Sequence, residues 1–358
     1  KIHPFTDNYG YVDISKILES FITTDIETFA SGSTVCPYIF GDENIYQYSI
    51  DFGEEYGSTP VIYSSLQSGG TKYIVNGAGT SIQDNYLVSD LSTYYTIDTS
   101  SSRFLRPSSY GRSSSSPIMI KSAESYQLSY LVTANNQASK LRIVTTDSLA
   151  ATVSTTISLQ YATINSTDKK FQVIPAGFDI NNLDAGTFSV TQPIIGTDIV
   201  SYTLQLLDNA NAASSEMVYF KVDTSCTKND AYRLHWLNRH GGYDSFTFDM
   251  ASTKNIDIEK MSYKTPLSTY GVTENSYDKT YLSKLQQKFT LTSNWISEDC
   301  AEMLEDLFTS PVVYRYDSIN SIYGFVRYKV LNTSYEIQQV ASKKLFNVTI
   351  EVQPAFNQ

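Results

Sequence analysis

Tryptophan, histidine and cysteine are scarce in this sequence. Its 358 residues include 2 tryptophans, 3 histidines and 3 cysteines. The cysteines, Cys36, Cys226 and Cys300, are widely spaced, form no Cys-x-x-Cys motif and cannot all pair with one another. We interpret them as free thiols of a protein made in a reducing cytoplasm.

The sequence also lacks a long apolar run and an excess of basic charge. Nothing in it approaches eighteen consecutive apolar residues, so no membrane-spanning segment is expected. With 26 basic and 37 acidic residues, its net charge is -11. Because an acidic surface repels phosphate groups, nucleic acid is not an expected partner.

Catalytic motifs are missing as well. His235 and His240 lie five residues apart, which is neither a helical nor a same-face strand spacing, and no His-Glu-x-x-His occurs. Asp244 follows His240 by four residues, but no Gly-x-Ser-x-Gly elbow supports a serine triad. The stretch from Asp179 to Asp184 has the wrong ligand spacing for a calcium loop. We therefore expect no catalytic residues, no metal, no cofactor and no enzymatic activity.

Tyrosine and phenylalanine, in contrast, are abundant. The chain has 28 Tyr and 17 Phe, and these side chains suit the pleated, half-buried surface of a sheet. Residues 45–52 alternate between polar and apolar side chains along their full length, as a half-buried strand does. Composition and alternation together predict a mainly β protein with few short helices.

The spacing of strand-like segments predicts three domains. An N-terminal β-rich domain spans residues 1–116. Residues 117–225 contain at least six short strand patterns separated by polar turns, which favours a sandwich of the immunoglobulin or fibronectin type III kind. A C-terminal β domain spans residues 226–358. Residues 107–117 are rich in serine, proline and glycine and predict a flexible loop or linker.

Two segments have the apolar spacing of a helix. Near the N-terminus, Asp13 is a reasonable N-cap for a short helix with Ile14, Ile17 and Phe21 on one face. The stronger pattern predicts a helix over 298–309. Its N-cap is Ser297, acidic residues occupy its first turn, and an apolar face is made by Ile296, Cys300, Met303, Leu304 and Leu307.

The densest motif lies in the C-terminal domain, between residues 236 and 246. A partner could be bound there through Arg239, His240 and Tyr243. Each residue also has an ordinary role in a turn, since a Gly-Gly pair permits a tight reversal and Asn or Asp can satisfy backbone groups. We favour the turn and keep the whole motif as a candidate structural or interface site: Trp236, Asn238, Arg239, His240, Gly241, Gly242, Tyr243 and Asp244.

This motif, Trp-Leu-Asn-x-x-Gly-Gly-Tyr-Asp-Ser-Phe, resembles the tail proteins of phages that infect Bacteroidetes. Two further stretches are similar to the same group: 104–107 with the strand pattern at 126–132, and 289–295 with the helix to Leu307 and the segment 310–314. The resemblance implies a structural virion component, such as a baseplate, distal-tail or adaptor subunit. It implies copies of the chain in a ring and other virion tail proteins as partners, a location in the virion tail, and no catalytic residues.

Other functions fit a β-rich, aromatic chain. A carbohydrate-binding surface protein of a Bacteroidetes cell would be built from similar sandwiches with aromatic platforms, and a phage receptor-binding protein would take a host-surface glycan as its partner. A glycoside hydrolase would need two acids at a fixed separation across a cleft, and nothing in the sequence indicates such a pair.

Overall fold

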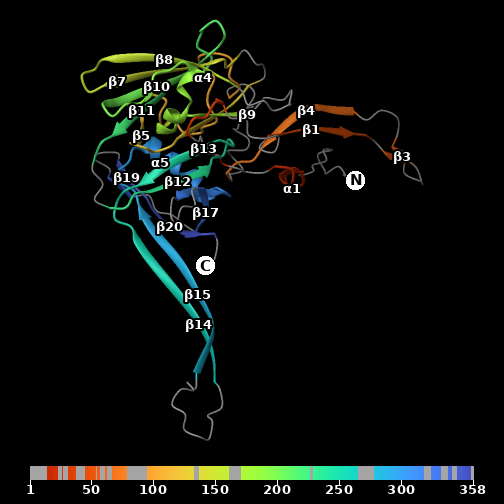
Figure 1. Cartoon of the computed structure of the whole chain (residues 1–358). Coiled ribbons are helices and arrows are strands. Elements are labelled where there is room, and N and C mark those ends of the chain that lie inside the picture. The colour runs from red at the N-terminus through yellow and green to blue at the C-terminus, as the bar shows by residue number, and fades with distance from the viewer. Residues whose placement is uncertain are drawn as a thin grey trace. The chain divides into compact units, whose positions relative to one another are not determined.

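The computed structural model describes residues 14–22, 26, 31–37, 45–53, 55–56, 61–62, 67–78, 95–132, 137–160, 171–225, 229–264, 278–317, 324–331, 338–340 and 345–355. The chain separates into two compact units. Unit 1 comprises Lys1–Asp223 and Leu237–Tyr243, and unit 2 comprises Thr224–Trp236 and Asp244–Gln358. The predicted mainly β fold with few short helices is confirmed (Figure 1). The division into three domains at residues 117 and 226 stays a prediction.

The main sheet of unit 1 has five strands. Their order is β5 (Ile118–Lys121), β11 (Val218–Asp223), β10 (Ile199–Leu207), β7 (Lys140–Asp147) and β8 (Thr152–Ser158). β5 runs parallel to β11, and the other neighbours are antiparallel. On β7 the residues Leu141, Ile143 and Thr145 are buried and alternate with half-buried ones, so one face of the sheet carries the core.

A second layer of unit 1 is the antiparallel pair of β6 (Gln127–Leu131) and β9 (Phe171–Pro175), which is buried almost throughout. Aromatic side chains join it to the main sheet. Tyr202 on β10 stacks on Phe220 of β11 with ring centroids 4.7 Å apart, and its hydroxyl donates a hydrogen bond to the carbonyl oxygen of Ala176, 2.8 Å away. Tyr126, just before β6, meets the same Phe220 edge-on. Two β layers are thus in contact, and their assignment to the immunoglobulin or fibronectin kind stays a prediction.

Short elements complete unit 1. The strand predicted from alternation is β1 (Ile45–Phe52), which pairs with β4 (Gln67–Val75). The N-terminal helix α1 is only Ser15–Glu19, and the predicted cap Asp13 lies outside the described residues. The remaining elements are β2 (Glu55–Tyr56), β3 (Val61–Ile62), the 3-10 helix η1 (Phe178–Asn182) and α4 (Ala185–Phe188).

Unit 2 is built on a seven-stranded sheet. The strand order is β13 (Tyr243–Phe248), β12 (Tyr232–Leu237), β16 (Val313–Asp317), β17 (Gly324–Val330), β20 (Thr349–Pro354), β15 (Asp278–Thr292) and β14 (Thr253–Lys264). The end residues Leu237 and Tyr243 belong to unit 1. A small separate pair is formed by β18 (Gln338–Val340) and β19 (Leu345–Asn347).

The sheet of unit 2 buries one face. Cross-strand partners lie on the same face, and the register joins the following buried residues into one apolar surface: Trp236, Val313, Tyr328, Val352, Phe289, Leu291 and Ile350. The opposite face carries exposed polar residues, among them Arg327, Lys329 and Glu351. The sheet of unit 2 therefore buries the first face along most of its width, whereas the second face is buried at His235 on β12 and exposed at these three residues.

Helix α5 (Glu298–Thr309) has the limits and the N-cap that the sequence predicts, with the Ser297 hydroxyl accepting a hydrogen bond from the Cys300 amide at 3.4 Å. Its predicted apolar face is buried, and Met303, Leu304 and Leu307 are fully enclosed. We infer that α5 covers the apolar face of the sheet. No helix among the described residues is long and apolar enough to cross a membrane.

Truncating the centre of the α5 core face should destabilise unit 2. Leu304 is completely buried, so Leu304→Ala should lower the free energy of unfolding by about 2–5 kcal/mol through lost burial and a cavity. Chemical denaturation measures this loss. Leu304→Met, which keeps the volume, is the control and should cost less than about 1.5 kcal/mol. An alanine variant as stable as the methionine variant would place this helix face on the surface.

Candidate functional site

The sequence motif at 236–244 forms a closed turn. Asn238 is fully buried, and its side-chain oxygen accepts hydrogen bonds from the amides of His240 at 2.9 Å and Gly242 at 3.1 Å. Its side-chain nitrogen donates to the carbonyl oxygen of Leu105 at 2.8 Å. Its backbone carbonyl accepts from the amide of Ala78 at 3.0 Å. One side chain thus closes the turn and attaches it to two distant segments of unit 1.

Both glycine positions of the motif lie too close to neighbouring segments of unit 1 to accept a larger side chain. Gly241 has φ +82°, a conformation that favours glycine, and a Cβ there would lie 2.0 Å from the Val75 side chain. A Cβ on Gly242 would lie 2.3 Å from the carbonyl oxygen of Leu105. The Gly-Gly pair therefore lets the turn enter the interior of unit 1.

An apolar cluster lies beneath the turn. It consists of Tyr95, Leu105, Phe171 and Val173. The ring of His240 meets Tyr95 edge-on, with centroids 4.5 Å apart. The turn is therefore fixed by packing as well as by hydrogen bonds.

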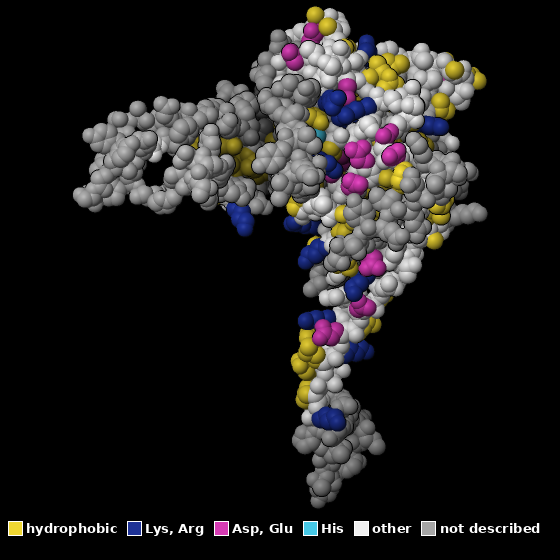
Figure 2. Space-filling model, turned by 180° about the vertical axis from the view of Figure 1, so that it is seen from behind, with side chains coloured by type: hydrophobic (Ala, Val, Ile, Leu, Met, Phe, Trp, Pro, Cys, Tyr) yellow, Lys and Arg dark blue, Asp and Glu magenta, His cyan; other side chains and the backbone are white. Residues whose placement is uncertain are grey.

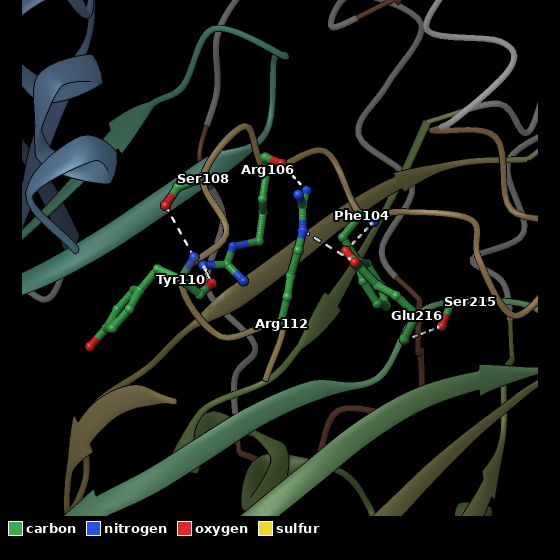
Figure 3. A network of polar contacts seen from close by, with 7 residues as sticks. All are labelled: Phe104, Arg106, Ser108, Tyr110, Arg112, Ser215 and Glu216. Carbon is green, nitrogen blue, oxygen red and sulfur yellow. Dashed lines mark hydrogen bonds and ion pairs between the residues drawn. The ribbon is translucent and has the colours of Figure 1, made fainter. Parts of the chain in front are cut away.

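The segment preceding β5 is held by a partly buried ion pair (Figure 3). The Arg112 guanidinium lies 3.2 Å from a carboxylate oxygen of Glu216 and donates to the carbonyl oxygen of Arg106 at 2.6 Å. The second oxygen of Glu216 accepts from the amide of Phe104 at 3.2 Å. The flexible loop or linker predicted for 107–117 is thus wrong for the first part of this segment, where Ser108 and Tyr110 are buried and Arg112 is bonded, whereas Ser113, Ser114 and Ser115 are exposed.

Arg106 is the second cation of this network, and only 1% of it is exposed. Its guanidinium donates to the carbonyl oxygen of Tyr110 at 2.7 Å and lies 5.8 Å from the centre of the Tyr126 ring. The Tyr110 hydroxyl accepts from the amide of Met119 on β5 at 2.8 Å. Figure 3 shows the Arg106 and Arg112 side chains alongside each other within the loop. Two arginines therefore organise a coil segment that has no regular structure.

The motif does not form one exposed binding surface. Residues 237–243 belong to unit 1, whereas Trp236 and Asp244, both fully buried, belong to unit 2. Only Arg239 of the predicted site residues is half-buried rather than buried. The structure thus gives the motif turn contacts, and a role as an interface stays a prediction. Arg106, Arg112 and Glu216 were missed, because two of them lie more than a hundred residues from the third and share no spacing pattern.

A buried histidine lies in unit 2. Nδ1 of His235 is 2.7 Å from the Ser245 hydroxyl, and its ring meets Phe325 edge-on with centroids 5.2 Å apart. Burial, and secondarily the nearby Arg233 charge, hold the pKa of His235 well below its ordinary value of 6.5. A neutral imidazole is therefore part of the packed sheet.

Two cysteines are buried free thiols, Cys36 in unit 1 and Cys300 in unit 2, and Cys226 lies outside the described residues. Burial, with a smaller contribution from Asp179, raises the pKa of the Cys36 thiol. In the part of the chain that the structure describes, no group of three or more His, Cys, Asp or Glu residues could hold a metal ion.

Comparison with known proteins finds structural neighbours but no related sequence. No protein-family model matches the sequence, and no curated protein matches it. A chain of the solved structure titled "Virion of native gene transfer agent (GTA) particle" is similar to this one, with 11% sequence identity and a TM-score of 0.25. The match covers 37% of this chain and 95% of that chain. A likeness of this extent does not by itself support a function.

Removing the side chain that closes the turn should destabilise unit 1. Asn238→Ala leaves the Leu105 carbonyl and two amides without their partner, so the free energy of unfolding should fall by about 2–4 kcal/mol. Denaturation followed by circular dichroism measures the loss. The exposed Asn209 is the control, and Asn209→Ala should change stability by less than about 0.5 kcal/mol. Equal stabilities of the two variants would contradict the role given to Asn238.

The stability of unit 2 should fall as the pH falls below 6.5. The folded pKa of His235 is lowered, so the unfolded chain binds a proton first and each further pH unit favours unfolding by up to about 1.4 kcal/mol. Denaturation between pH 7 and pH 5 measures the slope, above the range where most carboxylates titrate. In the His235→Gln variant, the slope of the free energy of unfolding against pH should be smaller by the contribution of one proton. An unchanged slope in that variant would show that His235 does not cause it.

Proposed function

We propose that this chain is a structural subunit of a bacteriophage tail, in a baseplate, distal-tail or adaptor position, that assembles with copies of itself and other virion proteins. The proposal assigns it no catalytic activity. The tail assignment rests on the sequence resemblance. The observation that carries self-assembly is an apolar face without a cover on the hairpin of β14 and β15.

This hairpin, called the arm below, extends beyond the sheet of unit 2 (Figure 1). β14 pairs with β15 from Thr253 to Lys264, whereas β20 pairs with β15 only from Phe289 to Thr292. Among the described residues, the rest of the arm has no further strand beside it. All residues of β14 are exposed.

One face of the arm continues the buried face of the sheet. Phe289, part of the unit 2 core, shares its face with Ile256 and with the pair of Ile258 and Leu285. The exposed fractions are 49% for Ile256 and 57% for Ile258. An isolated two-stranded hairpin is marginally stable in water, and adjacent exposed apolar side chains indicate a binding surface. Within the described ranges of unit 2, the apolar face of the arm thus lacks the layer that we infer for the same face of the sheet.

The other face of the arm is charged. The Lys288 ammonium lies 2.7 Å from the Asp257 carboxylate, and Glu259 lies directly opposite Lys284. Figure 2 shows basic, acidic and hydrophobic side chains exposed along the arm. This charged stretch is suited to water, although the Met261–Leu282 pair farther along the same face is apolar, so the proposed contact uses the face of Ile256 and Ile258.

The edge of β14 does not suit pairing with its own copy. An antiparallel two-fold pairing centred on Ile258 would place Asp257 opposite Glu259 twice, and one centred on Glu259 would oppose two glutamates. Because these central registers oppose acidic residues, we place the contact on the apolar face, against a different surface of the next copy. Such a heterologous contact closes into a ring when its rotation divides the circle.

A charge on the apolar face should prevent assembly. Ile258→Lys places an ammonium group in the proposed contact, so this variant should stay monomeric at concentrations where the wild-type chain forms larger species. Light scattering over a concentration series gives the mass. Glu259→Gln, which makes the same change in net charge on the opposite face, should assemble like wild type. Equal masses for the two variants would refute the arm as the self-contact.

The tail assignment needs the phage particle. Antibodies against this chain should label purified virions at the tail, in repeated copies around its axis. Absence from the particles would refute the assignment, and a monomeric chain that binds a soluble glycan would favour the carbohydrate-binding alternative. One observation favours that alternative: Trp295, in the loop before α5, is 50% exposed.

A further inference from the structure

Among the residues that the structure describes, nothing protects strand β8, an edge of the unit 1 sheet, against pairing with a further strand. Its sequence, Thr-Val-Ser-Thr-Thr-Ile-Ser, has no charged residue and no proline, and most of its residues are exposed. Exposed edge strands usually carry charges, prolines or bulges that prevent pairing. The β14 edge follows this rule with several charged residues, and β5 is short and contains Lys121.

At alternate residues of β8, the backbone amide and carbonyl groups point away from β7, toward the open edge. The Leu159 amide bonds the Ser139 carbonyl, on the β7 side, whereas Gln160 exchanges hydrogen bonds with Cys36 on the opposite side. By alternation, the outward-pointing residues of the strand are Thr152, Ser154, Thr156 and Ser158. Within the part of the chain that the structure describes, these outward groups have no strand beside them, since β8 pairs only with β7. The open edge ends at Ser158, where Cys36 takes the next position.

We propose that β8 pairs antiparallel with β8 of a second copy about a two-fold axis at Thr155. This register aligns outward groups with outward groups, since Ser154 faces the copy's Thr156 and Thr152 faces its Ser158. On the inner face Val153, which is 61% exposed, lies opposite the copy's Ile157. No charge opposes a charge, and two five-stranded sheets join into one.

The register follows from the strand and from symmetry. A two-fold axis perpendicular to the sheet keeps the inner face of one copy beside the inner face of the other, so only residues of equal parity can be opposed. Centring on Thr155 satisfies this condition, opposes β-branched side chains on the inner face, and leaves the Cys36 bridge outside the paired stretch. The inference does not rest on the proposed tail function, because it uses another surface on another unit.

A charge swap on the outer face tests the pairing. Ser154 and Thr156 are exposed and lie opposite each other across the axis. The double variant Ser154→Lys with Thr156→Lys opposes two pairs of ammonium groups and should raise the dimer dissociation constant about tenfold or more. Ser154→Lys with Thr156→Glu opposes unlike charges and should dimerise as the wild-type residues do. All variants carry Ile258→Lys, so that contacts of the arm do not contribute.

A disulfide tests the register. Thr155 and its copy form a non-hydrogen-bonded pair with Cα atoms about 4.5 Å apart, within disulfide reach. In a Cys226→Ser background, Thr155→Cys should cross-link the dimer on mild oxidation. Val153→Cys, on the same face but opposite Ile157, should not. The proposal is overturned if the Ile258→Lys chain is monomeric throughout, if both charge variants have the same mass as that chain, or if β8 gains amide protection only with a different partner protein.

Discussion

The packing of unit 1 depends on satisfying the backbone polar groups of a coil segment that runs through its interior. Such groups cost about 1–3 kcal/mol each when buried without a partner. Strands supply some of the partners, since the Leu105 amide donates to the Ser129 carbonyl on β6 and the Gly111 carbonyl accepts from the Tyr219 amide on β11. Side chains supply others: Glu216 accepts from Phe104, Arg112 donates to Arg106, and Asn238 donates to Leu105. The segment can be irregular and still buried because these three side chains bond backbone groups that the strands leave unpaired.

The open strand edges of the two units differ in their chemistry. The edge of β14 carries several charged residues, and two of its exposed apolar residues, Ile256 and Ile258, share one face, so its chemistry favours a contact that leaves the edge in water. The edge of β8 is uncharged and rich in β-branched residues, so its chemistry favours main-chain pairing. The two proposed contacts therefore differ in kind, and substitutions on different units can test each one independently.

The sequence predicted elements whose cause is local. Helix α5 and its cap at Ser297, and strand β1 from Ile45 to Phe52, have the predicted limits because capping and alternation act over a few residues. The polar segment at 107–117 was mistaken for a linker because its partner Glu216 lies far away in sequence. Likewise, the motif around Asn238 was found, but its partner, the carbonyl of Leu105, has no side-chain signature.

The two buried thiols allow the local opening of each unit to be measured separately. Cys36 lies in unit 1 and Cys300 in unit 2, and both are enclosed in the folded chain. A reagent can reach such a thiol only when the surrounding structure opens, so the labelling rate of each cysteine follows the local opening equilibrium. Peptide-resolved labelling would then compare the kinetics of the two units within one molecule, free or assembled, without an introduced probe.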